Sequence, residues 1–153
     1  MNQEKPIVEN EPRLIPLRDL QQKEIQDYLE SSRAFYNQFN ISIDNCTYDP
    51  EKNEFIIETE VPETNQAYKG FAHGGYISSL LDGAAGIIAL IKAAETGKIA
   101  VTRKLNVELL IAVPVGSLIK IVAKADSSTQ RGMHTMASMT QQVGDEERLL
   151  AWG

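Results

Sequence analysis

Residues 70–91 read GFAHGGYISSLLDGAAGIIALI. Apolar side chains recur at helical spacing after the pair Gly74-Gly75, which predicts a long helix that starts at this pair. The apolar positions are Ile77, Leu80, Leu81, Ala84, Ile87, Ile88 and Ile91. The opposite side of the predicted helix carries small or polar residues, and this pattern indicates a helix buried on several sides. We therefore expect the rest of the chain to fold around it.

Asp82 is the single acid inside this apolar run, and no Lys or Arg lies three or four residues away. An ionised carboxylate in such a place is costly unless it is hydrogen-bonded, paired or partly hydrated. Two interpretations stay open. Asp82 either points into solvent or caps a neighbouring loop, or it is the reactive group of a cleft beside the helix.

The start of the predicted helix favours the second interpretation, in which Asp82 is a reactive group. Gly74 and Gly75 leave their backbone N–H groups unshielded, and a helix N-terminus can stabilise a carbonyl oxygen that becomes negative. A glycine pair also suits a tight turn. Asp82 follows Gly74 by eight residues, which is about 12 Å along one helix. Both groups reach one carbonyl only if two antiparallel helices meet across a two-fold axis, which predicts a homodimer with two equivalent sites.

The composition is typical of one globular domain, with 153 residues, 42% of them hydrophobic and 24% charged. The net charge of −6 disfavours nucleic acid or an anionic membrane as the main partner. The most apolar run is interrupted by Asp82 and glycines, so we expect no membrane span. The polar N-terminus lacks a secretory signal, and Cys46 is the only cysteine, so we expect a cytoplasmic protein without disulfides.

The pattern along the chain predicts an extended arm at 1–18 and a single domain at 19–153. One further helix is expected from Asp19 to about Phe39, with Asp19 as its cap. Alternating or apolar runs predict strands at 41–48, 55–61, 99–111, 118–125, 133–143 and 148–152. A single apolar helix among about six strands predicts an α+β fold, in which a curved antiparallel sheet wraps round the helix.

With these residues in place, the sequence resembles the hotdog-fold acyl-CoA thioesterases, in particular the phenylacetate-type branch and its thioesterase-superfamily relatives. The resemblance is carried by His73-Gly74-Gly75 with an acid nine residues after the histidine, by VTRKLNV at 101–107, and by the Pro-x-Gly turn at 114–116. It implies the hotdog fold and hydrolysis of an acyl-CoA to a free acid and CoA. It also implies a dimer-interface site, no cofactor beyond the substrate's own CoA, and dimers that pair into tetramers.

The resemblance also implies roles for individual residues. Asp82 is the nucleophile or general base that acts on the thioester carbonyl, and Thr102 orients the attacking water or the carboxylate. The backbone N–H of Gly74, beside Gly75 in the substrate site, is the oxyanion donor, and His73 positions the thioester. His73 and Gly74 come from one subunit, and Asp82 and Thr102 from the other.

The remaining binding candidates are polar or basic. Asn65 and Gln66 are the two candidates for a polar residue that contacts the site shortly before the histidine. The cations that could meet the phosphates of coenzyme A are Lys69, Arg103, Lys104 and Arg131, although each could equally be a solvated surface charge. Relatives continue the last strand beyond the position of Gly153, so we expect this edge of the sheet to be short.

Other functions stay open at this point. A non-catalytic acyl-CoA-binding or regulatory protein on the same fold would bind its ligand without releasing free CoA. A hydratase or dehydratase on this fold is less consistent with the pattern, because those enzymes usually place their histidine and acid in different motifs. We expect no metal site, because His73 and His134 are the only histidines. No phosphate-binding loop, nucleophile elbow or dinucleotide motif occurs.

Overall fold

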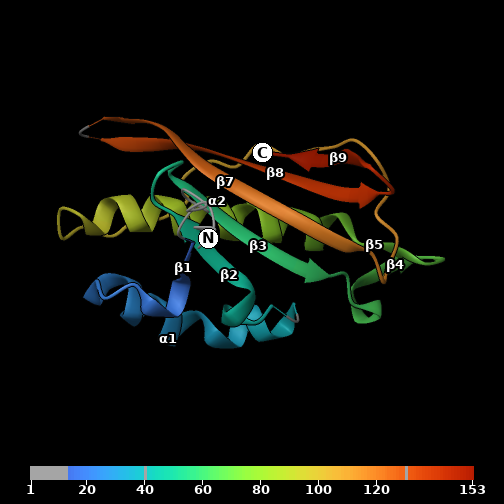
Figure 1. Ribbon diagram of the computed structural model, residues 1–153, viewed down its shortest axis with the longest axis horizontal. Coiled ribbons are helices and arrows are strands. Elements are labelled where there is room, and N and C mark those ends of the chain that lie inside the picture. Colours follow the sequence, from blue (N-terminus) through green and yellow to red (C-terminus); the bar gives the residue numbers. More distant parts are fainter. Residues whose placement is uncertain (1–13, 40, 130) are drawn as a thin grey trace, which may run out of the picture.

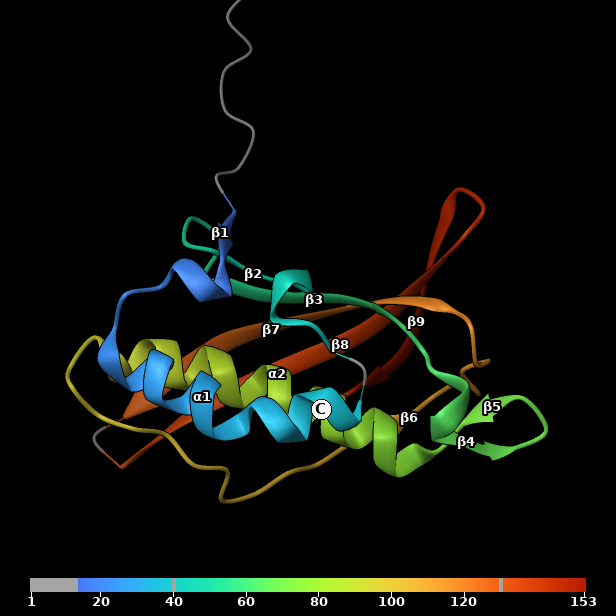
Figure 2. The same ribbon diagram turned by 90° about the horizontal axis from the view of Figure 1, so that it is seen from below.

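A long helix forms the axis of the molecule in the computed structural model, which describes residues 14–39, 41–129 and 131–153. This helix, α2 (Gly74–Ala94), lies against one face of a curved antiparallel sheet (Figure 1). A second helix, α1 (Lys23–Gln38), runs alongside α2 beyond one edge of the sheet. The view from below shows the strands arching over α2 (Figure 2). The α+β architecture predicted from the sequence is confirmed.

The sheet has seven strands in the order β1-β2-β3-β7-β8-β9-β6, and all neighbouring strands run antiparallel. The bounds are β1 (Ile15–Pro16), β2 (Cys46–Asp49), β3 (Glu54–Glu60), β6 (Glu108–Leu109), β7 (Leu118–Thr129), β8 (Gly132–Val143) and β9 (Glu146–Trp152). A separate hairpin of β4 (Gln66–Tyr68) and β5 (Phe71–Ala72) leads into α2. Three short 3-10 turns complete the described elements, η1 (Leu17–Asp19), η2 (Ile43–Asn45) and η3 (Glu63–Asn65).

The core lies between α2 and the sheet, where the helix packs on β3, β7 and β8. Every apolar position predicted for the helix is buried, and the facing strands bury alternate residues. These strand residues are Phe55, Ile57, Ile121, Ala123, Ala137 and Met139. By length and composition α2 could cross a membrane, and half of its apolar window is buried inside this fold. The central helix is therefore confirmed as the element around which the core forms.

The start of α1 differs from the prediction. Asp19 lies in η1 and is not a cap, because α1 begins at Lys23 after Gln22, whose side chain makes no capping hydrogen bond. Leu17 and Leu20 are both buried. A 3-10 turn followed by extended residues brings both leucines into the core, and this burial outweighs the capping preference of the aspartate.

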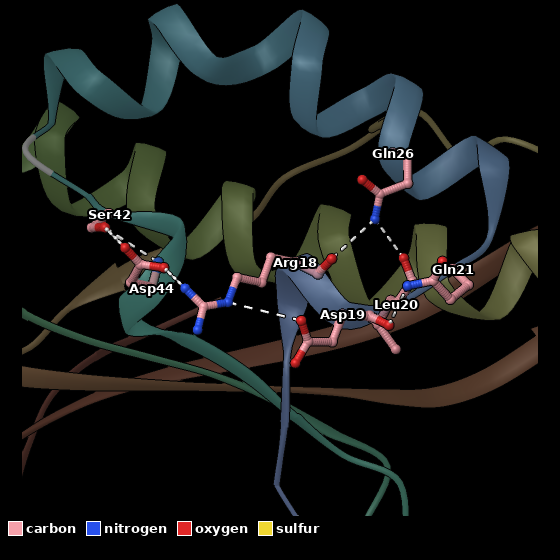
Figure 3. A network of polar contacts seen from close by, with 7 residues as sticks. All are labelled: Arg18, Asp19, Leu20, Gln21, Gln26, Ser42 and Asp44. Carbon is pink, nitrogen blue, oxygen red and sulfur yellow. Dashed lines mark hydrogen bonds and ion pairs between the residues drawn. The ribbon is translucent and has the colours of Figure 1, made fainter.

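A polar network ties the two flanks of α1 together (Figure 3). Arg18 of η1 forms an ion pair with Asp44 of η2, and the Gln26 side chain donates to the Leu20 carbonyl. Ser42 in turn caps η2, because its hydroxyl accepts from the Asp44 N–H at 3.2 Å. The ion pair is exposed and contributes at most about 1 kcal/mol. It joins η1, before α1 in the chain, to η2, which follows α1.

The strand predicted at 99–111 is wrong over most of its length, because only β6 (Glu108–Leu109) pairs with another strand. The register explains this difference. Glu108 lies opposite Trp152, and Gly153 exchanges backbone hydrogen bonds with Ala137. No residue of β9 therefore lies opposite 99–106, and this stretch has no regular structure.

Smaller differences occur at the other boundaries. The strand expected at 41–48 begins only at Cys46, because η2 occupies the residues before it. The hairpin of β7 and β8 is longer than predicted, and His134 lies in it opposite Ser127. Of the arm expected at 1–18, residues 1–13 lie outside the described residues. Its last part belongs to the sheet, because Ile15 pairs with Tyr48.

Candidate active site

The N-terminus of α2 presents free backbone donors. His73 is the N-cap, and its Nδ1 accepts a hydrogen bond from the Gly75 N–H at 2.8 Å. The His73 carbonyl accepts from the Ile77 N–H at 3.2 Å. The N–H groups of Gly74 and Tyr76 donate to no acceptor in the described part of the chain. These free donors, with the helix dipole behind them, suit a negative oxygen.

The cap also fixes the hydrogen-bonding role of the exposed His73 side chain. Because Nδ1 accepts a hydrogen bond, we assign the proton of the neutral ring to Nε2. Nε2 is then a hydrogen-bond donor. A Cβ on Gly75 would lie 2.9 Å from His73 Nδ1, so the glycine allows the ring to reach its capping position. His73, Gly74 and Gly75 thus form one unit at the helix start.

Asp82 forms a specific contact with the stretch after α2. Its Oδ1 accepts a hydrogen bond from the Thr102 Oγ1 at 2.8 Å, across 20 positions of sequence. The carboxylate is half-buried, and its Oδ2 accepts nothing from residues 14–39, 41–129 or 131–153. Figure 2 shows the 99–107 stretch passing α2 on the side away from the sheet. Asp82 is therefore held by Thr102 while one of its oxygens stays available.

The two halves of this site cannot meet within one chain. Gly74 is the first residue of α2, and Asp82 lies in the third turn of the same helix. The axial separation is about 12 Å, because each residue advances a helix by about 1.5 Å. One small reacting group cannot touch both.

The structure distinguishes the two polar candidates before the histidine. The Asn65 carbonyl accepts from the His73 N–H at 2.8 Å, and the Asn65 Nδ2 is buried without a hydrogen-bond partner. The Gln66 side chain is exposed and accepts from the Gly70 N–H in the β4–β5 turn. A buried amide donor without a partner is costly and therefore notable. Asn65 therefore has a buried donor without a partner next to His73, whereas the Gln66 amide is exposed.

The basic candidates are spread over the surface. Arg103 and Lys104 are exposed and directly follow Thr102. Lys69 lies in the β4–β5 turn next to the helix start, with its ammonium 5.3 Å from the centre of the Tyr68 ring. Arg131 belongs to the turn between β7 and β8, at the end of the molecule where α2 terminates (Figure 1). Within one chain, Arg131 and the helix start are thus at opposite ends.

Sequence reasoning did not single out a tyrosine pair beside Asp82. The hydroxyls of Tyr28 and Tyr36 lie 2.9 Å apart, and a Cβ on Gly83 would lie 3.5 Å from the Tyr36 hydroxyl. Burial raises the pKa of Tyr36 well above its usual value, and Tyr28, Cys46 and, last, Asp82 raise it further. The signal was the spacing of eight residues, which puts both tyrosines on one side of α1. In the part of the chain described, no three His, Cys, Asp or Glu residues could hold a metal ion.

The residues of this site lie within the part of the chain that matches a known family. The sequence model of the thioesterase superfamily matches residues 69–147, which is more than half of the chain and includes the helix start, Asp82 and Thr102. The chain belongs to the thioesterase superfamily. No curated protein matches its sequence.

Solved structures of hotdog-fold thioesterases resemble this superfamily member in fold. The E. coli PaaI protein from the phenylacetic acid degradation operon has a TM-score of 0.65 at 15% identity, over 83% of this chain and 84% of that one. The Streptococcus mutans protein smu.793, bound to acetyl-CoA, has a TM-score of 0.57 at 28% identity, over 66% and 76%. A mutant acyl-CoA hydrolase of Staphylococcus aureus in complex with coenzyme A has a TM-score of 0.61 at 19% identity. That match covers 67% of this chain and 61% of the hydrolase. The hotdog fold is thereby confirmed.

Proposed function

We propose that this chain hydrolyses the thioester of an acyl-CoA to the free acid and CoA, at a site completed by a second copy. The observation that carries the proposal is the hydrogen bond that holds Asp82 with Thr102 at 2.8 Å and leaves one carboxylate oxygen available. The Streptococcus mutans relative, which is 28% identical, was solved with acetyl-CoA, and this supports an acyl-CoA ligand. We include in the proposal a cytoplasmic homodimer or dimer of dimers that needs no cofactor.

The chemistry uses few groups. Asp82 either takes a proton from a water that attacks the carbonyl carbon, or attacks that carbon itself and forms a mixed anhydride, which a water then hydrolyses to the free acid and the free Asp82 carboxylate. The developing oxyanion accepts from the N–H of the partner subunit's Gly74. The carbon–sulfur bond then breaks, and the thiolate of CoA leaves and takes up a proton. Because a thioester is electrophilic and a thiolate leaves readily, no third triad member is required.

A second copy is supported by the exposed apolar residues around Thr102. Ile99 is 75% exposed and Val101 84% exposed, and Leu105 is also exposed. Such residues gathered on one unpaired stretch are unusual for a monomer and typical of an interface. A two-fold axis near this stretch would bring two α2 helices together antiparallel, so that each Asp82 approaches the partner's Gly74.

The activity is tested with a panel of short, long and aryl acyl-CoAs. We expect at least one of them to release free thiol at a rate proportional to protein concentration. Saturable binding of acyl-CoA without thiol release would instead support the non-catalytic binding protein. If the protein neither binds nor hydrolyses any acyl-CoA of the panel, both functions are excluded.

The shared site is tested by mixing two inactive variants. Asp82→Asn and Gly74→Pro chains, when co-expressed, form heterodimers in which one site carries both changes and the other carries neither. Random pairing makes half of the dimers mixed, so we expect about a quarter of wild-type activity per chain. The rate of thiol release from the unseparated co-expressed mixture measures this recovery, and heterodimers purified from it should reach about half of the wild-type activity. Activity no higher than that of either variant alone would place each site within a single chain.

Asn65→Ala is expected to lower kcat/KM by about 10- to 100-fold. The substitution removes the Nδ2 donor, and a hydrogen bond from this donor to a charged group of the substrate would contribute about 1.5–3 kcal/mol. The melting temperature should not fall, since the lost Nδ2 has no partner in the described chain. Gln66→Ala is the control, with an expected change of no more than about twofold because the side chain is exposed. The opposite ranking of the two variants would reassign the binding role to Gln66.

A further inference from the structure

Helix α1 approaches the active-site helix next to Asp82. Gly83 has no side chain, and the Tyr36 hydroxyl lies 3.5 Å from the position that a Cβ would occupy there. Tyr36 is only 4% exposed. The residue that follows Asp82 is thus in direct contact with Tyr36 of α1.

Tyr36 is held as a fixed wall and not as a loose side chain. Its hydroxyl lies 2.9 Å from that of Tyr28, and the two rings pack edge to face with centroids 6.4 Å apart. Burial raises the pKa of Tyr36, so the hydroxyl stays neutral at physiological pH. The wall that faces Gly83 is therefore uncharged and restrained by α1 itself.

Tyr36 also lines a hollow at the surface of the molecule. A surface hollow of about 500 Å³ is lined by Arg33, Tyr36, Asn37, Ile41, Ser42 and Ile43. Its η2 side is fixed by the ion pair of Arg18 with Asp44 (Figure 3). Tyr36 therefore contributes both to this hollow and to the contact with Gly83.

We propose that Tyr36 limits the length of the acyl group by closing the site on its α1 side. The inference rests on the proposed function and adds a substrate class to it, short acyl groups that end before the Tyr36 ring. Removing the ring joins the site to the hollow and admits longer chains. A methyl group added at Gly83 reduces the space between residue 83 and the Tyr36 ring.

The experiment compares kcat/KM for acetyl-, butyryl-, hexanoyl- and decanoyl-CoA. The wild type is expected to prefer the two shorter substrates. Tyr36→Ala should raise the ratio of decanoyl to butyryl turnover by about 10-fold or more, since a few methylenes in an apolar pocket discriminate to that extent. Gly83→Ala should lower the same ratio, and its added Cβ makes only ordinary contacts. Tyr36→Leu provides a second shortened side chain if the alanine variant does not fold.

Tyr36→Phe separates the volume of the ring from its hydroxyl. A profile like that of the wild type supports the proposal, because the ring is retained. A shift as large as that of Tyr36→Ala would assign the effect to the hydroxyl and overturn it. An unchanged ratio in the folded alanine or leucine variant would also overturn it. This result differs from failure of the proposed function, in which the wild type hydrolyses none of the substrates.

Discussion

Asp82→Asn is expected to lower kcat for acyl-CoA hydrolysis by about 100- to 10,000-fold, the range in which general-base groups contribute. The amide has nearly the same shape as the carboxylate, and its Oδ1 can still accept from Thr102. The substitution therefore removes the negative charge and the basic oxygen but keeps the local geometry. Steady-state rates of thiol release at saturating acyl-CoA measure the effect.

The expected loss is specific to this acid. Asp126→Asn is the matched control, because that carboxylate is exposed on β7 and its Oδ2 lies 3.7 Å from Nδ1 of the exposed His134. Its activity should stay within about twofold of the wild type. The melting temperature of Asp82→Asn should not fall, since an amide is easier to bury than a charge. If Asp82→Asn kept full turnover, Asp82 would have no part in the reaction.

Gly74→Pro is expected to lower kcat by about 100- to 1,000-fold, which is the usual effect of deleting one oxyanion donor. Proline has no backbone N–H, and it is well tolerated at the first position of a helix. The preceding residue must have an extended backbone, and His73 has φ −68° and ψ 135°. The variant therefore deletes the proposed donor and leaves the helix start in place. Turnover and the melting temperature are both measured.

Gly74→Ala separates the donor from the added bulk. The alanine places a Cβ at the same position, 2.9 Å from the flexible Cδ1 of Leu109, and it keeps the N–H. We expect this variant to retain most of the wild-type activity, because the leucine side chain can shift. Equal losses in the alanine and proline variants would show that crowding at Leu109, and not the missing N–H, lowers the rate.

Much of the fold was readable because its pattern is local. The spacing of apolar residues in 77–91 predicts α2, and all of these positions are buried. The turn after β2 is also held by local contacts, because the Asp49 Oδ1 accepts from the N–H groups of Glu51 and Lys52. Periodicity and turn chemistry depend on near neighbours in the sequence, so they can be recognised without knowledge of the fold.

The predictions were wrong where residues far apart in the sequence determine the local structure. The alternation in 99–111 is that of a strand, but a strand needs a partner, and the β6–β9 register leaves 99–106 without one. Asp19 has the chemistry of a cap, but burial of Leu17 and Leu20 moves the helix start to Lys23. Neither the register of a distant strand nor the competition for core space is encoded in a local pattern.

The sequence by itself determined the central helix, the glycine pair at its start and the acid two turns further on, because these depend on spacing along one helix. Only the tertiary structure decided which groups lie beside them. It brought Thr102 to Asp82, left the Asn65 amide without a partner near His73, and packed Tyr36 against Gly83. These contacts join segments far apart in the chain, and they form only when α1, α2 and the stretch after α2 pack together.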